Sequence, residues 1–269
     1  MHYVSKGDEN KQLMLFIHGF PEFWYSWRHQ MKEFAKDYHV IAVDNRGYGD
    51  TDKPTGAQNY TVDRLVEDTR EFIEALNKKN IILVAHDWGG AIGWGMAAKY
   101  PELVQKLVII NSPHPAMFRK RSLKQFFYSW YMLFNSLPVL PEFAMGANDF
   151  YMFDNAFING DGRPLLPDSQ MEAYKYTFQK NGLTAPLNWY RALIHRLPPK
   201  YPHPKSFQIK MPTLHIWGKK DRYLTSQLAQ VHEHVDDLTL HYIENCSHWT
   251  QMDQPDLVNQ YMRQFLAKK

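Results

Sequence analysis

Three side chains that could together hydrolyse a substrate through a covalent intermediate lie far apart in the sequence, at Asp87, Asp221 and His248. Each follows a short apolar run. A carboxylate can attack a carbon atom, a histidine can take a proton from water, and a second carboxylate can orient the histidine. The order nucleophile, acid, histidine is typical of hydrolases built on a doubly wound sheet. These residues therefore predict a catalytic triad with Asp87 as the nucleophile.

The sequence around Asp87 predicts a sharp turn from a strand into a helix. Gly89 and Gly90 open a segment rich in glycine and alanine, and small neighbours let such a turn lift its central side chain clear of the sheet. The leading position, usually glycine, holds Ala85, whose Cβ this turn can tolerate. A dinucleotide-binding loop is disfavoured because the G-x-G-x-x-G order is missing. The remaining alternative is that Asp87 is a plain helix N-cap.

Two backbone N–H groups are expected to form an oxyanion hole. One belongs to Trp88, the residue after the nucleophile, and the other to Phe20 in a loop that follows an early apolar run. Pro21 has no N–H of its own and restricts the turn beside Phe20. The alternative is that this loop is a tight connection without a catalytic role.

The elements that must position these residues follow from the alternation of apolar runs with amphipathic segments. This alternation predicts an α/β fold, a doubly wound and mostly parallel sheet with helices on both faces. Polar residues just past the carboxyl ends of such strands are expected to meet at one edge. The expected strands are 13–18, 39–43, 81–86, 106–111, 212–217 and 238–243, and the expected helices are 26–37, 62–77, 89–100, 225–235 and 255–267.

The alternation stops between Pro113 and Gln208, where aromatic-rich helical segments are divided by glycine and proline turns. We therefore expect a core domain of residues 1–112 and 208–269 with an inserted helical lid of residues 113–207. The most apolar stretch of the lid is broken by Pro138 and Pro141, so it predicts a lid helix and a turn rather than a membrane span.

Composition excludes several other functions. The 269 residues are 44% hydrophobic with a net charge of +3, which is typical of a globular protein and excludes disorder. The densest basic cluster, Arg119, Lys120, Arg121 and Lys124, is not typical of a nucleic-acid site, and it is interpreted as a solvated helix face rather than a phosphate-binding or membrane-binding site. The single cysteine, Cys246, cannot form an intrachain disulfide and is compatible with a reducing compartment. The histidines contain no HExxH motif, so a zinc enzyme is not expected.

Taken together, these motifs resemble the α/β-hydrolase-fold epoxide hydrolases. The matching segments are 18–24, 44–49, 86–90, 186–191 and 247–249, which span nearly the whole chain. The resemblance implies an α/β-hydrolase fold without a cofactor and two lid tyrosines that hold the epoxide oxygen. It identifies Tyr190 as one of them, and spacing favours Tyr131 over Tyr128 as the other.

The resemblance implies that an apolar epoxide and water yield a vicinal diol through an ester on Asp87. The aromatic lid predicts an apolar pocket. Its expected lining includes Phe20, Trp88, Trp130 and Trp189, and the neighbouring Phe126, Phe127, Met132 and Phe134 strengthen the prediction. No nucleic acid and no membrane-spanning segment are expected, and the oligomeric state and the physiological epoxide stay open.

Two alternatives for the function remain. A dehalogenase uses the same aspartate, histidine and acid, but haloalkane dehalogenases usually have Asn where this chain has Phe20, and fluoroacetate dehalogenases usually have Arg where it has Trp88. The other alternative is a ligand-binding member of the fold without turnover. A cytoplasmic location is expected because no signal-peptide pattern opens the sequence. Relatives carry a first strand before His2, so an upstream anchor stays an open alternative.

Overall fold

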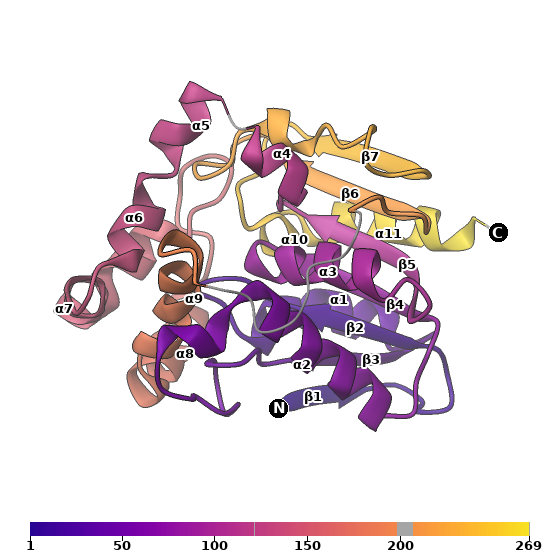
Figure 1. Cartoon of the computed structure of the whole chain (residues 1–269), viewed down its shortest axis with the longest axis horizontal. Helices are drawn as coiled ribbons and strands as arrows, with labels where there is room; N and C mark the ends of the chain where they lie inside the picture. Colours follow the sequence, from indigo (N-terminus) through magenta and orange to yellow (C-terminus); the bar gives the residue numbers. More distant parts are fainter. Residues whose placement is uncertain (121, 198–206, 269) are drawn as a thin grey trace.

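The computed structural model describes residues 1–120, 122–197 and 207–268. A seven-stranded sheet runs through its centre, in the order β1-β3-β2-β4-β5-β6-β7 (Figure 1). The edge strand β1 pairs antiparallel with β3, and the other neighbours are parallel. The predicted α/β fold with a mostly parallel sheet is confirmed. The strands are β1 Tyr3–Lys6, β2 Leu13–Ile17, β3 His39–Val43, β4 Ile81–His86, β5 Val104–Ile110, β6 Thr213–Gly218 and β7 Leu238–Ile243.

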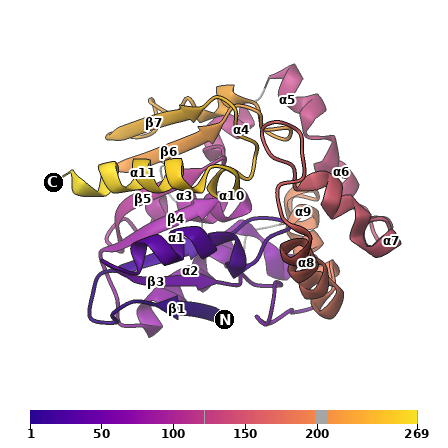
Figure 2. The same ribbon diagram turned by 180° about the vertical axis from the view of Figure 1, so that it is seen from behind.

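Two hydrophobic cores cover the two faces of this sheet. Along β2, Leu13, Leu15 and Ile17 join one core while Met14 and Phe16 join the other, because successive side chains of a strand point to opposite faces. Helices α2 (Val62–Ala75) and α3 (Trp88–Lys99) pack on the first face, and α1 (Arg28–Phe34) and α11 (Pro255–Ala267) on the second, as Figure 2 shows from behind. Burial on both faces explains the nearly continuous apolar runs of the central strands.

The chain between β5 and β6 forms a group of helices at one end of the sheet (Figure 1). They lie beyond the carboxyl ends of the parallel strands, on the side where β4 runs into α3. Of the two prolines predicted to break this segment, Pro138 lies between two of these helices. Pro141 instead lies in the first turn of the helix Leu140–Ala156, where its missing N–H removes no intrahelical hydrogen bond. The helices are α4 Pro115–Arg119, α5 Leu123–Tyr128, α6 Trp130–Ser136, α7 Leu140–Ala156, α8 Asp168–Asn181 and α9 Thr184–Ile194.

One predicted helix is wrong. Residues 225–235 form a single 3₁₀ turn, η3 (Ser226–Ala229), and then an irregular segment. Ile209 pairs with Val235 in an isolated bridge, in which the N–H of Ile209 donates to His234 O and the N–H of Asp236 donates to Ile209 O. These long-range hydrogen bonds hold the backbone extended at the end of the segment, where a helix would need its own i to i−4 bonds.

Two predictions about segments of the chain concern residues 198–204 with Arg121 and a possible membrane span. Prolines 198, 199, 202 and 204 and Arg121 lie outside the described residues, so the end of the expected lid and one member of the basic cluster have no structural description. Within the described part of the chain, no helix combines the length and the apolar character that crossing a bilayer requires.

Candidate active site

Asp87 occupies a strained turn between β4 and α3. Its backbone has φ 51° and ψ −121°, a left-handed conformation that ordinarily favours glycine. A Cβ on Gly89 would lie 2.3 Å from the carbonyl oxygen of Ile17, and one on Gly90 would lie 2.2 Å from Cβ of Ser112. Glycines at these positions therefore let α3 start close against neighbouring strands. The Asp87 carboxylate makes no capping hydrogen bond to α3, which argues against the N-cap alternative.

The carboxylate of Asp87 points toward the loop that follows β2. Its Oδ1 accepts the N–H of Phe20 at 2.9 Å, and a Cβ on Gly19 would lie 2.4 Å from the same oxygen. Burial acts to raise the pKa of Asp87, but the hydrogen bond and positive charge of His248 and the N–H of Phe20 outweigh it, and the pKa falls below its usual value. Asp87 is therefore an anion at neutral pH. Trp88 opens α3, so its N–H has no partner within the helix.

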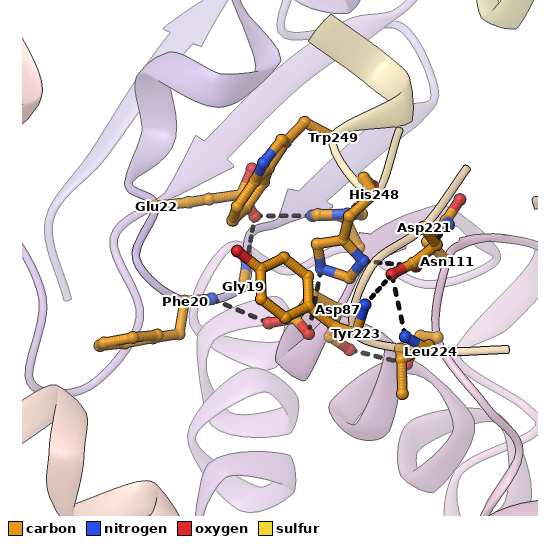
Figure 3. A network of polar contacts seen from close by, with 12 residues as sticks. Gly19, Phe20, Glu22, Asp87, Asn111, Asp221, Tyr223, Leu224, His248 and Trp249 are labelled. Atoms are coloured by element: carbon orange, nitrogen blue, oxygen red, sulfur yellow. Dashed lines mark hydrogen bonds and ion pairs between the residues drawn. The ribbon is translucent and has the colours of Figure 1, made fainter. Parts of the chain in front are cut away.

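His248 lies between two carboxylates, as Figure 3 shows. Its Nδ1 is 2.6 Å from Oδ2 of Asp221, and its Nε2 is 3.4 Å from Oδ2 of Asp87. Burial acts to lower the pKa of His248, but the charges of Asp221 and Asp87 prevail and raise it to about 10. Three side chains that are far apart in the sequence are thus brought together at the carboxyl ends of β4, β6 and β7.

The carboxylate of Asp221 accepts hydrogen bonds from other groups besides His248. The N–H groups of Tyr223 and Leu224 donate to its Oδ1 at 2.7 and 2.9 Å, and Nδ2 of Asn111 donates to its Oδ2 at 2.8 Å (Figure 3). The side-chain oxygen Oδ1 of Asn111 in turn accepts the N–H of Gly218. Sequence reasoning missed Asn111, although its place directly after β5 matches the signal that identified the triad residues.

A second buried network lies behind His248 and was also missed. Glu22 Oε2 is 2.7 Å from Nδ1 of His86 and accepts the N–H of Gly19, while Nε2 of His86 is 2.9 Å from the carbonyl oxygen of His248. Burial acts to raise the pKa of Glu22, but His86 and the other nearby donors lower it, so the buried carboxylate is ionised. This network links the Phe20 loop to the backbone of His248.

Two cavities of about 560 and 250 Å³ share Asp87, Tyr131 and Tyr190 in their walls. The two tyrosine rings lie edge to face with centroids 6.2 Å apart. Burial and the nearby charge of Asp87 raise the pKa of Tyr190 well above 10, and burial and Tyr190 do the same for Tyr131. Both phenols therefore keep their protons at neutral pH. Tyr128 lines neither cavity.

The aromatic residues predicted to form the pocket divide into three groups. Phe20 and Trp130 line the smaller cavity and Trp88 the larger one. Trp189 lies behind Trp88, with its ring nitrogen donating to Arg46 O, and lines neither cavity. Phe126 and Phe127 are exposed and also lie outside the cavity walls. Their side chains face solvent instead.

Among the described residues no group of three or more His, Cys, Asp or Glu side chains has a geometry that could hold a metal ion. The residues around the two cavities instead comprise an ionised carboxylate, an imidazole with its own carboxylate, and two protonated phenols. Such a set can attack an electrophilic carbon, protonate the oxygen that leaves it, and then activate water.

Comparison with known proteins is consistent with this chemistry. A family model described as alpha/beta hydrolase fold matches residues 12–255. The whole chain is 42% identical to Epoxide hydrolase 1 of Caenorhabditis elegans, covering 68% of it, and 41% identical to human Epoxide hydrolase 4, covering 76% of it. A crystal structure of a mutant epoxide hydrolase from Bacillus megaterium superposes with a TM-score of 0.90 at 34% identity, over 99% of this chain and 96% of that one.

Proposed function

The chain belongs to the α/β-hydrolase-fold epoxide hydrolases, and from this premise we propose that Asp87 is the nucleophile that opens the epoxide. The reaction adds water to an epoxide and gives a vicinal diol. The observation that carries the assignment is the position of Asp87 in the walls of both cavities, together with Tyr131 and Tyr190.

In the first step, an oxygen of Asp87 attacks a ring carbon and the bond from that carbon to the epoxide oxygen breaks. The attacking atom is Oδ2, because Oδ1 accepts the N–H of Phe20. The departing oxygen would be a strongly basic alkoxide, so it needs a proton from Tyr131 or Tyr190, and the second phenol donates a hydrogen bond to it. The product of this step is an ester between Asp87 and the opened substrate.

In the second step, His248 takes a proton from water, and the water oxygen attacks the carbonyl carbon of the ester. Alkylation has removed the charge of Asp87, one of the two carboxylates that raise the pKa of His248, so the imidazolium first gives its proton to the tyrosinate left by the first step and becomes the neutral base. Asp221 keeps the ring oriented. The N–H groups of Phe20 and Trp88 stabilise the oxyanion, and one such donor contributes about 10²- to 10³-fold in rate elsewhere.

The atoms and protons then balance. The ester collapses, His248 returns its proton to the departing alcohol oxygen, and the diol leaves. The oxygen of the water stays in the carboxyl group of Asp87, whose proton returns to His248 as Asp87 ionises again. No metal or organic cofactor is required in any of these steps.

The lid, the location and the partners are also proposals. We propose that residues 113–207 form the lid over a core of residues 1–112 and 208–269, supported by the position of α4 to α9 at one end of the sheet. An apolar epoxide and water are the proposed partners, with no nucleic acid. A cytoplasmic location is supported by Cys246, which is a buried free thiol.

A single-turnover experiment in ¹⁸O-labelled water tests the assignment. With enzyme in excess over styrene oxide, the diol of the first turnover should contain no label, because its new oxygen comes from Asp87. The peptide that contains Asp87 should gain the label. Label in the diol and none in the peptide would mean that water attacks the epoxide directly and that Asp87 is not the nucleophile.

The dehalogenase alternative is separated by its product. The same enzyme preparation is incubated with a chloroalkane and chloride is measured beside diol formation from styrene oxide. We expect diol and no chloride, since the atoms that face Asp87 from the lid are two phenols suited to protonating oxygen. If neither diol nor chloride is formed, the result would favour the ligand-binding alternative.

A further inference from the structure

The helices α5 and α6 expose an apolar stripe to solvent instead of burying it. Ser129 continues the helical path between them, because its N–H donates to Gln125 O and its own carbonyl accepts the N–H of Met132. Apolar side chains recur three or four positions apart along this path, which places them on one face. This stripe, the outer apolar face, consists of Leu123, Phe126, Phe127, Trp130, Leu133 and Leu137, and all six are exposed.

The opposite stripe of the same two helices is buried and largely polar. Gln125 is fully buried: its Nε2 donates to the carbonyl oxygen of Tyr223 at 2.9 Å, and its Oε1 accepts the N–H of Thr225 at 2.8 Å. Asn135 and Ser136 are buried on the same side. These contacts fix the rotation of the helix pair, so the outward direction of the apolar face is built into the fold.

The exposure is unusually complete for such residues. Leu123 is 81%, Phe127 72% and Trp130 63% exposed, and the face continues into Val139 and Leu140 at the start of α7. Single exposed apolar side chains are ordinary, but a continuous patch of aromatic and aliphatic side chains marks a surface that binds something. The patch lies on α5 and α6. Figure 1 shows these two helices on the outer side of the helical group, away from the sheet.

The charge around this face indicates what it binds. Residues 113–141 contain four basic residues and no Asp or Glu. Lys120 and Lys124 are exposed beside the start of α5. An interface between two copies related by a two-fold axis would bring the same basic segment of both copies together, which is unfavourable. A surface that combines apolar acyl chains with anionic headgroups fits both properties.

We propose that the outer apolar face and the basic residues before it dock this chain on an anionic lipid bilayer. The aromatic rings and leucines enter the boundary between headgroups and acyl chains, and the lysines contact the headgroups. Trp130 belongs to the outer apolar face and also lines the smaller cavity. Docking therefore brings one wall of that cavity to the bilayer surface, where apolar molecules concentrate.

Vesicle flotation with the full chain tests the proposal without measuring turnover, so its outcome does not depend on the proposed function. Wild type should float with vesicles of phosphatidylcholine and phosphatidylglycerol and bind weakly to phosphatidylcholine alone. The double variant Phe126→Ser/Phe127→Ser should lose about 10-fold or more of this partitioning. A control of similar chemistry, Tyr3→Ser/Tyr176→Ser, removes two exposed aromatic rings elsewhere and should bind as wild type.

The electrostatic part has its own variants. Lys120→Gln/Lys124→Gln should weaken binding to the anionic vesicles by about 10- to 30-fold, which corresponds to about 1 kcal/mol for each lysine near the surface. Lys32→Gln/Lys220→Gln removes two exposed lysines elsewhere as a matched control. Thermal unfolding confirms that each variant is folded.

Three results would overturn the proposal. The first is wild type that floats with neither kind of vesicle. The second is equal loss of binding in the face variants and their controls. The third is a dimer in analytical ultracentrifugation that disappears in Phe126→Ser/Phe127→Ser while vesicle binding is absent, which would assign the face to self-association.

Discussion

The Nε2 atom of His248 lies 3.4 Å from Oδ2 of Asp87, a distance that suits an ion pair better than a close hydrogen bond. The other ring nitrogen is held at 2.6 Å by Asp221. The imidazole is therefore oriented by Asp221 on one side and only loosely engaged on the side of the proposed nucleophile. Once Asp87 is an ester, the same nitrogen can accept a proton from water instead.

The first prediction concerns the role of His248 in the second step. In His248→Gln, alkylation of Asp87 should still occur and ester hydrolysis should stall. Intact-protein mass spectrometry after addition of styrene oxide should then show the mass of one substrate added. His232→Gln, a change at an exposed histidine, should show no lasting adduct. Turnover near the wild-type rate in His248→Gln would exclude this histidine from the mechanism.

The second prediction concerns the two phenols. Tyr190→Phe or Tyr131→Phe should slow alkylation by about 10- to 10³-fold, since each removes one donor to the epoxide oxygen. Stability should change by about 1 kcal/mol, the value of one hydrogen bond, because the rings remain. Tyr128→Phe is the matched control in the same aromatic run. Rapid-quench kinetics of adduct formation measures the effect, and slower alkylation in Tyr128→Phe alone would show that the wrong lid tyrosine was chosen.

The third prediction concerns stability and pH. The pKa of His248 is about 10 in the folded chain and 6.5 as the reference for the unfolded one. A histidine whose pKa is raised on folding contributes its full stabilisation below pH 6.5, and this stabilisation is lost as the pH rises through about 10. Wild type should therefore lose free energy of unfolding across that window, measured by urea denaturation, and His248→Gln should lose less.

Other titrating groups do not produce this difference. Burial lowers the pKa of His114 to about 4 and that of His215 to about 3. These two groups therefore change the free energy of unfolding only below about pH 6.5, outside the window in question. The buried thiol of Cys246 has a raised pKa and contributes above pH 9, equally in both proteins. Parallel curves for wild type and His248→Gln would contradict the raised pKa.

The fourth prediction concerns the backbone around Asp87. Gly89→Ala should destabilise the fold by about 1–3 kcal/mol or more, because the new Cβ would lie 2.3 Å from the carbonyl oxygen of Ile17. Gly146→Ala is the matched control, since a Cβ there has open space around it, and in a helix alanine is favoured by about 0.5–1 kcal/mol. Chemical denaturation compares the two, and equal stabilities would mean that the turn is looser than the structure has it.

The sequence by itself determined the parts of this protein that depend on neighbouring residues. The strands follow from continuous apolar runs, and the turn at Asp87 follows from the small residues beside it. The order of Asp87, Asp221 and His248, each after a strand, predicted that they meet at one edge of the sheet. Parallel strands carry that information because their carboxyl ends lie together.

The tertiary structure alone decided which distant residues support the site and which way the helices between β5 and β6 face. Asn111 meets Asp221, and Glu22 meets His86, only because the sheet order places β5 beside β6 and β2 beside β4. Hydrogen bonds between Gln125 and residues about a hundred positions away turn Phe126 and Phe127 outward. The aromatic sequence had instead suggested that these two side chains line the pocket. Helical periodicity defines two opposite faces, but it does not specify which face is buried, because that depends on the partner against which the helix packs.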